Sequence, residues 1–263
     1  MFGSYKKNKS QSSVSSPKKF DVQKISFTMS EAYNFLRANL KFSVPNKEKG
    51  KVIGITSAYP QEGKSYTSIN LAYSLAKYGS KVLLIDADMR RSQLFAALSL
   101  PASPGLSNLL ASDSNPDETV HRGVFDENLS ILMSGDFPPN PAELLESDKM
   151  AELVARFSQE YEYILIDLPP VAVVADPLFV SKHLDGMLMV VRHKESRRKH
   201  VNSAVRHLKF SGVKIIGFIY NGYSKHATYR RRYSSRYYTK YYTKYYTSKT
   251  KISEPKSSTE KSN

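Results

Sequence analysis

A chain of 263 residues with a formal net charge of +15 and no cysteine excludes disulfide-stabilised folds and thiolate metal sites. No apolar run approaches the ~20 residues that a membrane-spanning helix needs, and no apolar stretch follows the first lysines as in a signal peptide, so we expect a cytoplasmic protein. Much of the charge lies near the C-terminus, where residues 224–263 hold eleven Lys and Arg against two acidic residues.

The two ends of the chain differ in composition from its middle. Residues 1–24 and 223–263 are rich in Ser, Lys, Arg, Thr and Tyr and poor in aliphatic side chains. Such segments bury too little apolar surface to offset the entropy of an ordered chain. The composition therefore predicts a folded body over residues 25–222, with a flexible segment on either side.

Within the body, an amphipathic helix is predicted over residues 28–43, and short apolar strands then alternate with longer helical periods. The pattern predicts strands at 51–57, 81–88, 128–135, 163–167, 186–192 and 213–221. It predicts helices at 64–79, 141–159, 176–184 and 194–212. Unbroken apolar strands alternating with helices are typical of an α/β fold with a mostly parallel sheet covered on both faces.

The loop after the first strand carries a phosphate-binding motif. Residues 58–65, "AYPQEGKS", follow the pattern G-x-x-x-x-G-K-[ST], except that alanine replaces the first glycine. In this motif backbone N–H groups surround phosphate oxygens, the lysine reaches the β- and γ-phosphates, and the last hydroxyl binds Mg²⁺. The strand–loop–helix context argues against a chance match in a turn. The nucleotide-binding candidates here are Ala58, Gln61, Glu62, Gly63, Lys64, Ser65 and Tyr66.

Three aspartates follow apolar strands. Asp86 and Asp88 end "LLIDAD", and Asp167 ends "YILID". A single aspartate in such a place is usually a turn former or a helix cap. Because ligands of open α/β sheets bind at the carboxyl ends of the strands, three aspartates beside a phosphate loop predict Mg²⁺ binding and proton transfer.

"SAYPQEGKS", "LLIDADMRR" and "YILIDLPP", followed by a tyrosine-rich tail, resemble the bacterial tyrosine kinases, the P-loop autokinases of capsule and exopolysaccharide synthesis. The resemblance implies a P-loop NTPase-like fold and an ATP- and Mg²⁺-dependent protein-tyrosine kinase. It implies catalytic roles for Lys64, Asp86 and Asp88, and metal binding by Ser65, Asp86, Asp88 and Asp167. Asn221, in "YNGY", is an adenine-side candidate.

The same resemblance implies partners. They are a separate transmembrane activator at the inner face of the cell membrane, a ring-shaped homo-oligomer and a cognate tyrosine phosphatase. The family's oligomer motif, E-x-x-R-x-x-R, is matched by Glu31 and Arg37, but Asn34 stands at its middle position. Ser92 departs from the proline that the family commonly carries after the double arginine.

The resemblance also gives the tyrosine repeat "YYTKYYTKYYTS" (237–248) a role as the kinase's own substrate. The candidate acceptors are Tyr233, Tyr237, Tyr238, Tyr241, Tyr242, Tyr245 and Tyr246. A phenol with a pKa near 10 is a poor nucleophile at neutral pH, so a carboxylate must take or position its proton. Asp86 is the first candidate for this group and Asp88 the second.

Two alternatives remain open from the residues. A partition or cell-division ATPase of the ParA/MinD type shares the fold and the three motifs, but it carries a second lysine early in the phosphate loop, where this chain has Tyr59. A basic, tyrosine-rich tail could also bind nucleic acid by charge and stacking. A tail alone does not require three phosphate- and metal-handling motifs, which disfavours nucleic acid as the partner.

Overall fold

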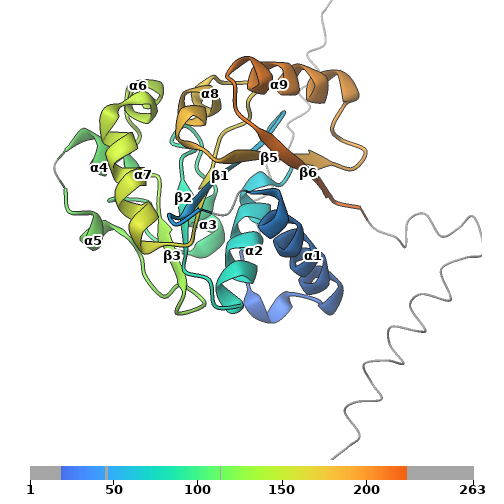
Figure 1. Ribbon diagram of the computed structural model, residues 1–263, viewed down its shortest axis with the longest axis horizontal. Coiled ribbons are helices and arrows are strands. Elements are labelled where there is room, and N and C mark those ends of the chain that lie inside the picture. The colour runs from blue at the N-terminus through green and yellow to red at the C-terminus, as the bar shows by residue number, and fades with distance from the viewer. Residues whose placement is uncertain (1–18, 45–46, 113, 224–263) are drawn as a thin grey trace, which may run out of the picture. The chain divides into compact units, whose positions relative to one another are not determined.

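The computed structural model describes residues 19–44, 47–112 and 114–223. The candidate acceptors from Tyr233 to Tyr246 lie outside these residues. Within them, six parallel strands form one sheet in the order β3-β2-β4-β1-β5-β6 (Figure 1). The strands are β1 (Lys51–Ser57), β2 (Val82–Asp86), β3 (Leu129–Leu132), β4 (Tyr163–Asp167), β5 (Gly186–Arg192) and β6 (Ile215–Asn221). The predicted parallel α/β sheet is confirmed, and each strand lies within or on its predicted range.

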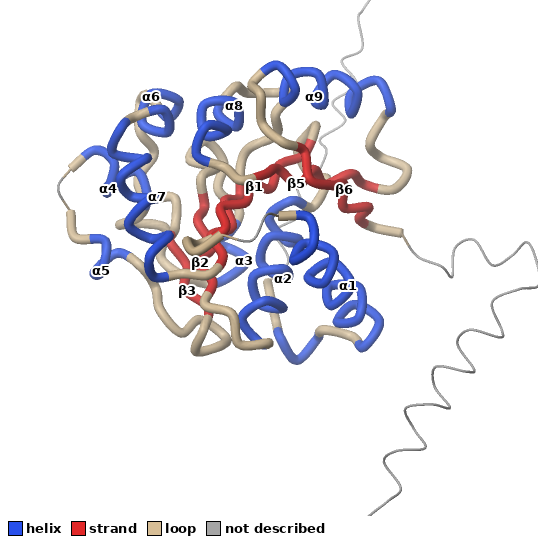
Figure 2. The backbone as a smooth tube through the Cα atoms, viewed as in Figure 1, coloured by secondary structure: helices blue, strands red, loops and turns tan. Residues whose placement is uncertain are grey.

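Helices cover the sheet on both sides (Figure 2). They are α1 (Phe27–Ser43), α2 (Lys64–Lys77), α3 (Leu94–Leu98), α4 (Leu106–Ala111), α5 (Pro116–Thr119), α6 (Pro141–Glu146), α7 (Asp148–Glu160), α8 (Asp176–Val180) and α9 (Arg198–Phe210), with the 3-10 turns η1 (Val22–Lys24) and η2 (Ser181–His183). No helix among the described residues is long and apolar enough to cross a membrane.

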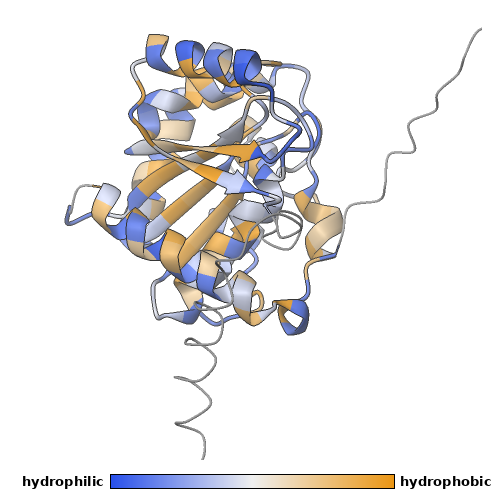
Figure 3. Cartoon of the chain, turned by 90° about the vertical axis from the view of Figure 1, so that its right-hand side faces the viewer, coloured by the Kyte–Doolittle hydropathy of each residue, from blue (hydrophilic) through white to orange (hydrophobic). Residues whose placement is uncertain are grey.

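Strands β1 to β4 are buried on both faces because alternate side chains enter two separate cores, and most of β5 is buried as well, whereas the edge strand β6 stays partly exposed. Val52 of β1 belongs to the first core, which holds apolar residues of α4, α6, α7, α8 and α9, whereas Ile53 belongs to the second core, which holds those of α1, α2 and α3. Figure 3 shows the resulting hydrophobic strands between helices whose outer faces are hydrophilic. This two-sided burial explains why the strand sequences are unbroken apolar runs.

Two predicted helix boundaries were wrong. The helix expected over 141–159 is two helices, α6 and α7, which meet at Ser147. The Ser147 hydroxyl oxygen accepts a hydrogen bond from the N–H of Met150, 3.3 Å away, and so caps α7. The helix expected over 194–212 begins only at Arg198, because Lys194 has a positive φ of 63° and ends the preceding strand in a turn.

Ordered structure also begins before residue 25, the predicted start of the folded body. Phe20 is only 6% exposed, and its N–H donates to the carbonyl of Ala97 at 2.8 Å. Its ring packs edge-to-face against Phe125, with ring centroids 5.2 Å apart. One aromatic anchor and one backbone hydrogen bond therefore attach residues 19–24 to the second core.

The sheet order places the predicted motifs at one edge. β1 lies between β4 and β5. The strands β2, β3 and β4 lie on one side of β1 and the strands β5 and β6 on the other, so the strand order reverses direction at β1, which is the switch point of the sheet. Asp86 at the end of β2 pairs in register with Asp167 at the end of β4. The phosphate loop follows the neighbouring β1, at the same carboxyl edge, which is where open α/β sheets bind ligands.

Candidate active site

Gly63, the last residue of the phosphate loop before α2, has a φ of 90°, a value that favours glycine. A Cβ at this position would lie 2.0 Å from Nδ2 of Asn221. That amide donates to the carbonyl of Glu62 at 3.0 Å. Asn221, at the end of β6, therefore touches the phosphate loop directly, and glycine is the residue that permits this approach.

The Glu62 side chain stabilises the start of the loop. It is 4% exposed, and its Oε2 accepts hydrogen bonds from the N–H groups of Ala58 at 2.8 Å and Tyr59 at 3.1 Å. Its Oε1 accepts from the hydroxyl of Ser196. A single carboxylate thus joins the two ends of the phosphate loop to the β5–α9 connection.

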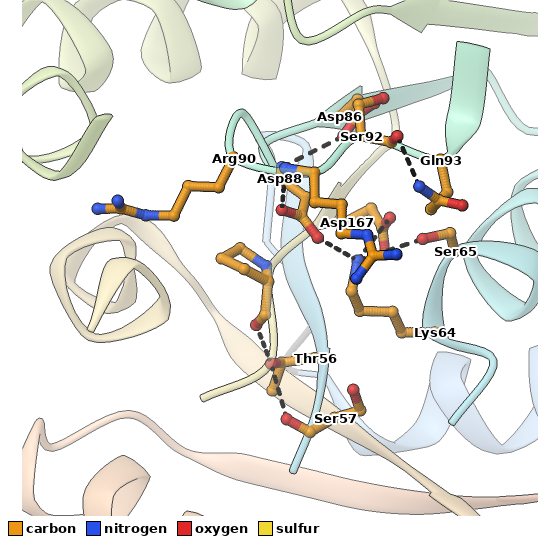
Figure 4. Close-up of polar contacts among 12 residues, drawn as sticks. Thr56, Ser57, Lys64, Ser65, Asp86, Asp88, Arg90, Ser92, Gln93 and Asp167 are labelled. Atoms are coloured by element: carbon orange, nitrogen blue, oxygen red, sulfur yellow. Dashed lines mark hydrogen bonds and ion pairs between the residues drawn. The ribbon is translucent and has the colours of Figure 1, made fainter. Parts of the chain in front are cut away.

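The ammonium group of Lys64 lies among the site's carboxylates (Figure 4). Its Nζ is 2.8 Å from Oδ2 of Asp88 and 3.4 Å from Oδ2 of Asp167, and it donates to the hydroxyl of Ser65 at 3.2 Å. Asp167 also accepts a hydrogen bond from Ser68 at 3.0 Å. The structure therefore brings four of the predicted catalytic and metal-binding residues into one contact group.

Asp86 contacts this group through the backbone N–H of Asp88. It is fully buried, with an exposed fraction of 0%, and accepts hydrogen bonds from the hydroxyl of Ser92 and from the N–H of Asp88 at 3.2 Å. Burial, followed by the charge of Asp167, raises the pKa of Asp86 to about 7. A carboxylate with such a pKa can hold or release a proton near neutral pH, which a general base requires.

Burial and charge act in opposite directions on the other two groups. Burial raises the pKa of Asp167, although the nearby Lys64 ammonium opposes the shift. For Lys64, burial alone would lower the pKa, but the charges of Asp167 and Asp88 outweigh it and raise the pKa above its ordinary value. The lysine is therefore a permanent positive charge among buried carboxylates.

The remaining nucleotide-binding candidates contribute mainly backbone. Ala58 is buried, and Gln61 has a φ of 66° while its carbonyl accepts from Arg192 Nη1 at 2.7 Å. The ring of Tyr66 packs against Phe20, with centroids 6.3 Å apart, so its side chain turns toward the second core. Ala58 and Gln61 belong to the loop itself, whereas Tyr66 lies in the first turn of α2.

Two contacts at the site were not anticipated from the sequence. Ser92, which stands where the family commonly has proline, donates its hydroxyl hydrogen to the candidate base Asp86. Arg90 forms a two-pronged ion pair with the buried Asp176 at the start of α8, at 2.8 and 3.0 Å. The sequence marks Asp176 as unusual, because it is the single charged residue in the apolar segment "PVAVVADPLF". Its partner Arg90 could not be found in this way, since the two residues are 86 positions apart in the sequence.

The predicted oligomer residues make contacts within their own chain. Glu31 accepts a hydrogen bond from the Asn34 amide at 2.9 Å, and the Arg37 guanidinium lies 3.8 Å from the ring centroid of Tyr78. Asn34, which departs from the family motif, is thus a local partner of Glu31. A role for these residues between subunits stays a prediction.

The donor set fits a phosphate-bound Mg²⁺ ion. Carboxylate and hydroxyl oxygens are the ligands that Mg²⁺ prefers, and it usually takes only one or two carboxylates together with substrate phosphates. Among the described residues no three His, Asp or Glu side chains are arranged to hold a metal by themselves. Ser65 and one or two of the candidate carboxylates Asp86, Asp88 and Asp167 would help to hold an ion that enters with a nucleotide.

A phosphate loop at the switch point of a parallel sheet, with a buried lysine and carboxylates beside it, defines a P-loop nucleotide-binding protein. A family model described as an AAA domain matches residues 50–182. The tyrosine-protein kinase YwqD of Bacillus subtilis is 37% identical over 202 residues, which cover 76% of this chain and 84% of that protein. The chain belongs to the bacterial tyrosine-protein kinase family and is a protein-tyrosine kinase.

Solved structures agree with this assignment. The kinase domain of the Escherichia coli tyrosine kinase ETK superposes with a TM-score of 0.74 at 30% identity, over 83% of this chain and 86% of that one. The chain spans only 27% of the putative tyrosine-protein kinase EpsB of Ralstonia nicotianae, with which it shares 37% identity over 203 residues. The septum site-determining protein MinD of Pyrococcus horikoshii, in a complex with Mg-ADP, gives a lower TM-score of 0.56 at 25% identity.

Proposed function

We propose that this chain is an ATP- and Mg²⁺-dependent autokinase that phosphorylates its own C-terminal tyrosine cluster. The observation that carries the proposal is the Lys64 ammonium, held 2.8 Å from Asp88 and 3.4 Å from Asp167 at the mouth of the phosphate loop. A buried cation at this place suits the binding of an anionic phosphate chain. The tyrosines that follow β6 in the sequence provide the acceptors.

In the proposed reaction, Lys64 exchanges its carboxylate partners for phosphate oxygens, and the N–H groups at the start of α2 face the same anion. Mg²⁺, when bound, neutralises charge on the transferring phosphate. Asp88 and Asp167, relieved of the lysine, are then able to take part in holding the metal. Asp86, with a pKa raised to about 7, accepts the proton of the tyrosine hydroxyl or orients it.

The chain's own dimensions permit tail phosphorylation between subunits, as they permit it within one chain. Twenty-five residues separate Asn221 from Tyr246, and a chain of this length reaches at most ~80–90 Å. A tyrosine of one subunit is therefore within reach of the site of a neighbour. We propose that a ring-shaped oligomer, with Glu31 and Arg37 at its contacts, places the tails in this way.

The cellular role that we propose is the control of capsule or exopolysaccharide synthesis. A transmembrane activator would hold the kinase at the cytoplasmic face of the cell membrane and raise its activity, and a tyrosine phosphatase would reverse the modification. The support is the family assignment and the relative described as a putative tyrosine-protein kinase in the cps region of Klebsiella pneumoniae, 32% identical over 198 residues.

A positioning ATPase is the second candidate, supported by the likeness to MinD. The loop argues against it. The position of the second lysine is held by Tyr59, whose ring stacks near His200 with centroids 4.4 Å apart. An aromatic side chain there supplies no positive charge to a neighbouring subunit's nucleotide.

Lys64→Met tests the proposal. The purified full-length variant is incubated with ATP and Mg²⁺, and phosphotyrosine is measured. We expect labelling to fall by about 10²-fold or more, because the lysine supplies charge stabilisation to the transferring phosphate. The matched control is Lys77→Met, which removes an exposed lysine from the other end of α2. Wild-type labelling by a folded Lys64→Met chain would show that the site is assigned wrongly.

Transfer between subunits needs a second experiment. The Lys64→Met chain, with its tail intact, is mixed with a full-length chain in which the seven candidate tyrosines are replaced by phenylalanine. Phosphate on the Lys64→Met tail would support transfer in trans. Its absence, while the wild-type chain labels itself at a rate independent of concentration, would contradict it.

A further inference from the structure

The exposed side of α9 and the turn before it carry a concentrated positive charge that the kinase reaction does not use. We define this basic face by its exposed side chains, Lys194, Arg197, Arg198, Lys199, Arg206 and Lys209. Between residues 192 and 214 there are eight Lys and Arg and a single acidic residue, Glu195. Glu195 pairs with Arg192 at 3.0 Å, so it neutralises none of the six residues of the basic face.

The helical period keeps this charge on one side. Ala204 and Leu208 are buried against the first core, and Arg198, Lys199, Arg206 and Lys209 lie on the opposite side of the helix. In the part of the chain that the structure describes, Arg197, Arg198 and Lys199 form no ion pair with an acidic side chain. The face is thus open to an anion from outside the described domain.

The start of α9 breaks the usual rules for a helix N-terminus. This end carries a partial positive charge and favours acidic residues, yet the first turn holds no acidic residue and begins with Arg198 and Lys199. The N-cap residue, Arg197, makes no side-chain hydrogen bond to the first N–H groups. Exposed basic side chains therefore share the first turn of α9 with N–H groups that have no side-chain cap, and both features favour a phosphate group.

The tyrosine-rich segment follows the strand beside this place. Arg192 at the end of β5 pairs in register with Asn221 at the end of β6, and the N–H of His193 donates to the Asn221 carbonyl at 2.8 Å. Twelve residues separate Asn221 from Tyr233, and they reach at most ~40 Å. The thirteen residues of α9 are ~20 Å long, so every part of the basic face lies within that reach.

Given the autokinase function proposed above, we propose that the C-terminal segment 229–246 docks on the basic face of α9 once its tyrosines are phosphorylated. Before modification the segment has six Lys and Arg and no acidic residue, so the basic face repels it. Phosphates on its seven candidate tyrosines add about −10 to −14 at pH 7, which changes the net charge of the segment from +6 to about −4 to −8. Phosphorylation therefore reverses the sign of the interaction.

Docking of the segment would withdraw the product tail from the catalytic sites. The basic face begins at the connection that braces the phosphate loop, where Ser196 donates to Glu62 and Arg192 donates to the Gln61 carbonyl at 2.7 Å. A tail bound to the basic face would not occupy the carboxylate group around Lys64. The basic face is in this account a phosphotyrosine-binding surface that ends a cycle of autophosphorylation.

An anionic membrane is the competing occupant, because Phe210, at the end of α9, is 93% exposed and basic residues attract acidic headgroups. The tail is favoured by its starting point beside β5 and by the uncapped phosphate-binding geometry at Arg197. Headgroup binding would depend on the whole face and on Phe210, whereas phosphotyrosine binding depends most on the start of the helix. The two occupants therefore respond to different substitutions.

The test measures binding of a fluorescent synthetic peptide of residues 236–247, with phosphate on every tyrosine, to the full-length unphosphorylated Lys64→Met chain. Because the phosphates are added chemically, the result does not depend on kinase activity. We expect the phosphopeptide to bind at least about tenfold more tightly than the unmodified peptide. The combined substitution Arg197→Ser, Arg198→Ser and Lys199→Ser should weaken it by about tenfold or more.

The matched control removes the same charge from the opposite edge of the sheet, by Lys49→Ser, Lys77→Ser and Lys81→Ser, and should bind the phosphopeptide as well as the parent chain does. Arg197→Ser alone guards against misfolding, because serine is a preferred N-cap and should leave the melting temperature equal or higher. This variant should still bind the phosphopeptide less tightly than its parent.

Equal binding of the two peptides, or equal weakening by the charge-matched control, would overturn the docking proposal. The proposal would also be overturned by a membrane-binding result. In that result the parent binds vesicles of phosphatidylglycerol and phosphatidylcholine, Phe210→Ser and the triple substitution abolish this binding, and neither change affects phosphopeptide binding. Labelling of the wild-type tail with ATP is measured separately. If the tail is labelled but the phosphopeptide does not bind, the kinase function stands and the docking fails.

Discussion

Replacing the buried Glu62 by alanine should destabilise the domain and loosen its phosphate loop. The carboxylate accepts hydrogen bonds from the N–H groups of Ala58 and Tyr59 and from the hydroxyl of Ser196. Alanine leaves the buried Ala58 N–H without a partner, and an unsatisfied buried donor costs about 1–3 kcal/mol. Tyr59 is partly exposed and water can satisfy it, so we expect a total loss of about 2–4 kcal/mol.

Thermal unfolding followed by circular dichroism measures this loss. A destabilisation of about 1 kcal/mol lowers the melting temperature by about 2–4 °C in a domain of this size, so the expected decrease is about 4–15 °C. Glu62→Gln keeps one acceptor oxygen and should give an intermediate decrease. Glu152→Ala, in which an exposed glutamate of α7 is removed, is the matched control and should change the melting temperature by no more than about 1–2 °C. A Glu62→Ala chain that melts with the control would refute the bracing role of this carboxylate.

Two further substitutions test contacts of the site. Ser92→Ala removes the hydroxyl donor to the buried Asp86 carboxylate, so the melting temperature should fall by about 2–8 °C. The kcat for tail phosphorylation should also fall, while the KM for ATP stays nearly unchanged. A restored kcat in Ser92→Thr would confirm that the hydroxyl positions Asp86, and an unaltered kcat in Ser92→Ala would contradict this role. Gly63→Ala places a Cβ 2.0 Å from Nδ2 of Asn221 at a φ of 90°, so nucleotide affinity measured by calorimetry should fall by at least about tenfold. The double variant Gly63→Ala, Asn221→Ala should recover part of this affinity. No loss of affinity in the single variant would rule out the close approach of Asn221 to the loop.

The sequence predicted well those features that neighbouring residues determine. The strand ends at Asp86 and Asp167 follow from apolar runs, and a phosphate loop requires a strand before it and a helix after it, as β1 and α2 provide. The sequence also contains a sign of the break between α6 and α7, because serine is a preferred N-cap and Ser147 precedes an acidic residue. The apolar period that runs across both helices nevertheless predicted one continuous helix.

Contacts between distant segments were not predictable in the same way. The pairing of Arg90 with Asp176 depends on how the loop after β2 meets the start of α8, and no local pattern specifies that meeting. The same holds for Asn221 at Gly63, which the resemblance suggested only as an adenine-side residue. Short helices such as α3, of five residues, give too few turns for a periodic signal.

The central claim is that the site around Lys64 transfers phosphate to the chain's own tyrosines. Purified full-length protein is incubated with ATP and Mg²⁺, alone and with the cytoplasmic segment of a cognate transmembrane activator, and the modified residues are mapped by mass spectrometry. The account predicts phosphate on tyrosines between Tyr233 and Tyr246, more of it with the activator segment, and at least about 10²-fold less in the Lys64→Met chain. ATP hydrolysis with no phosphotyrosine under either condition would contradict it and would favour a positioning ATPase.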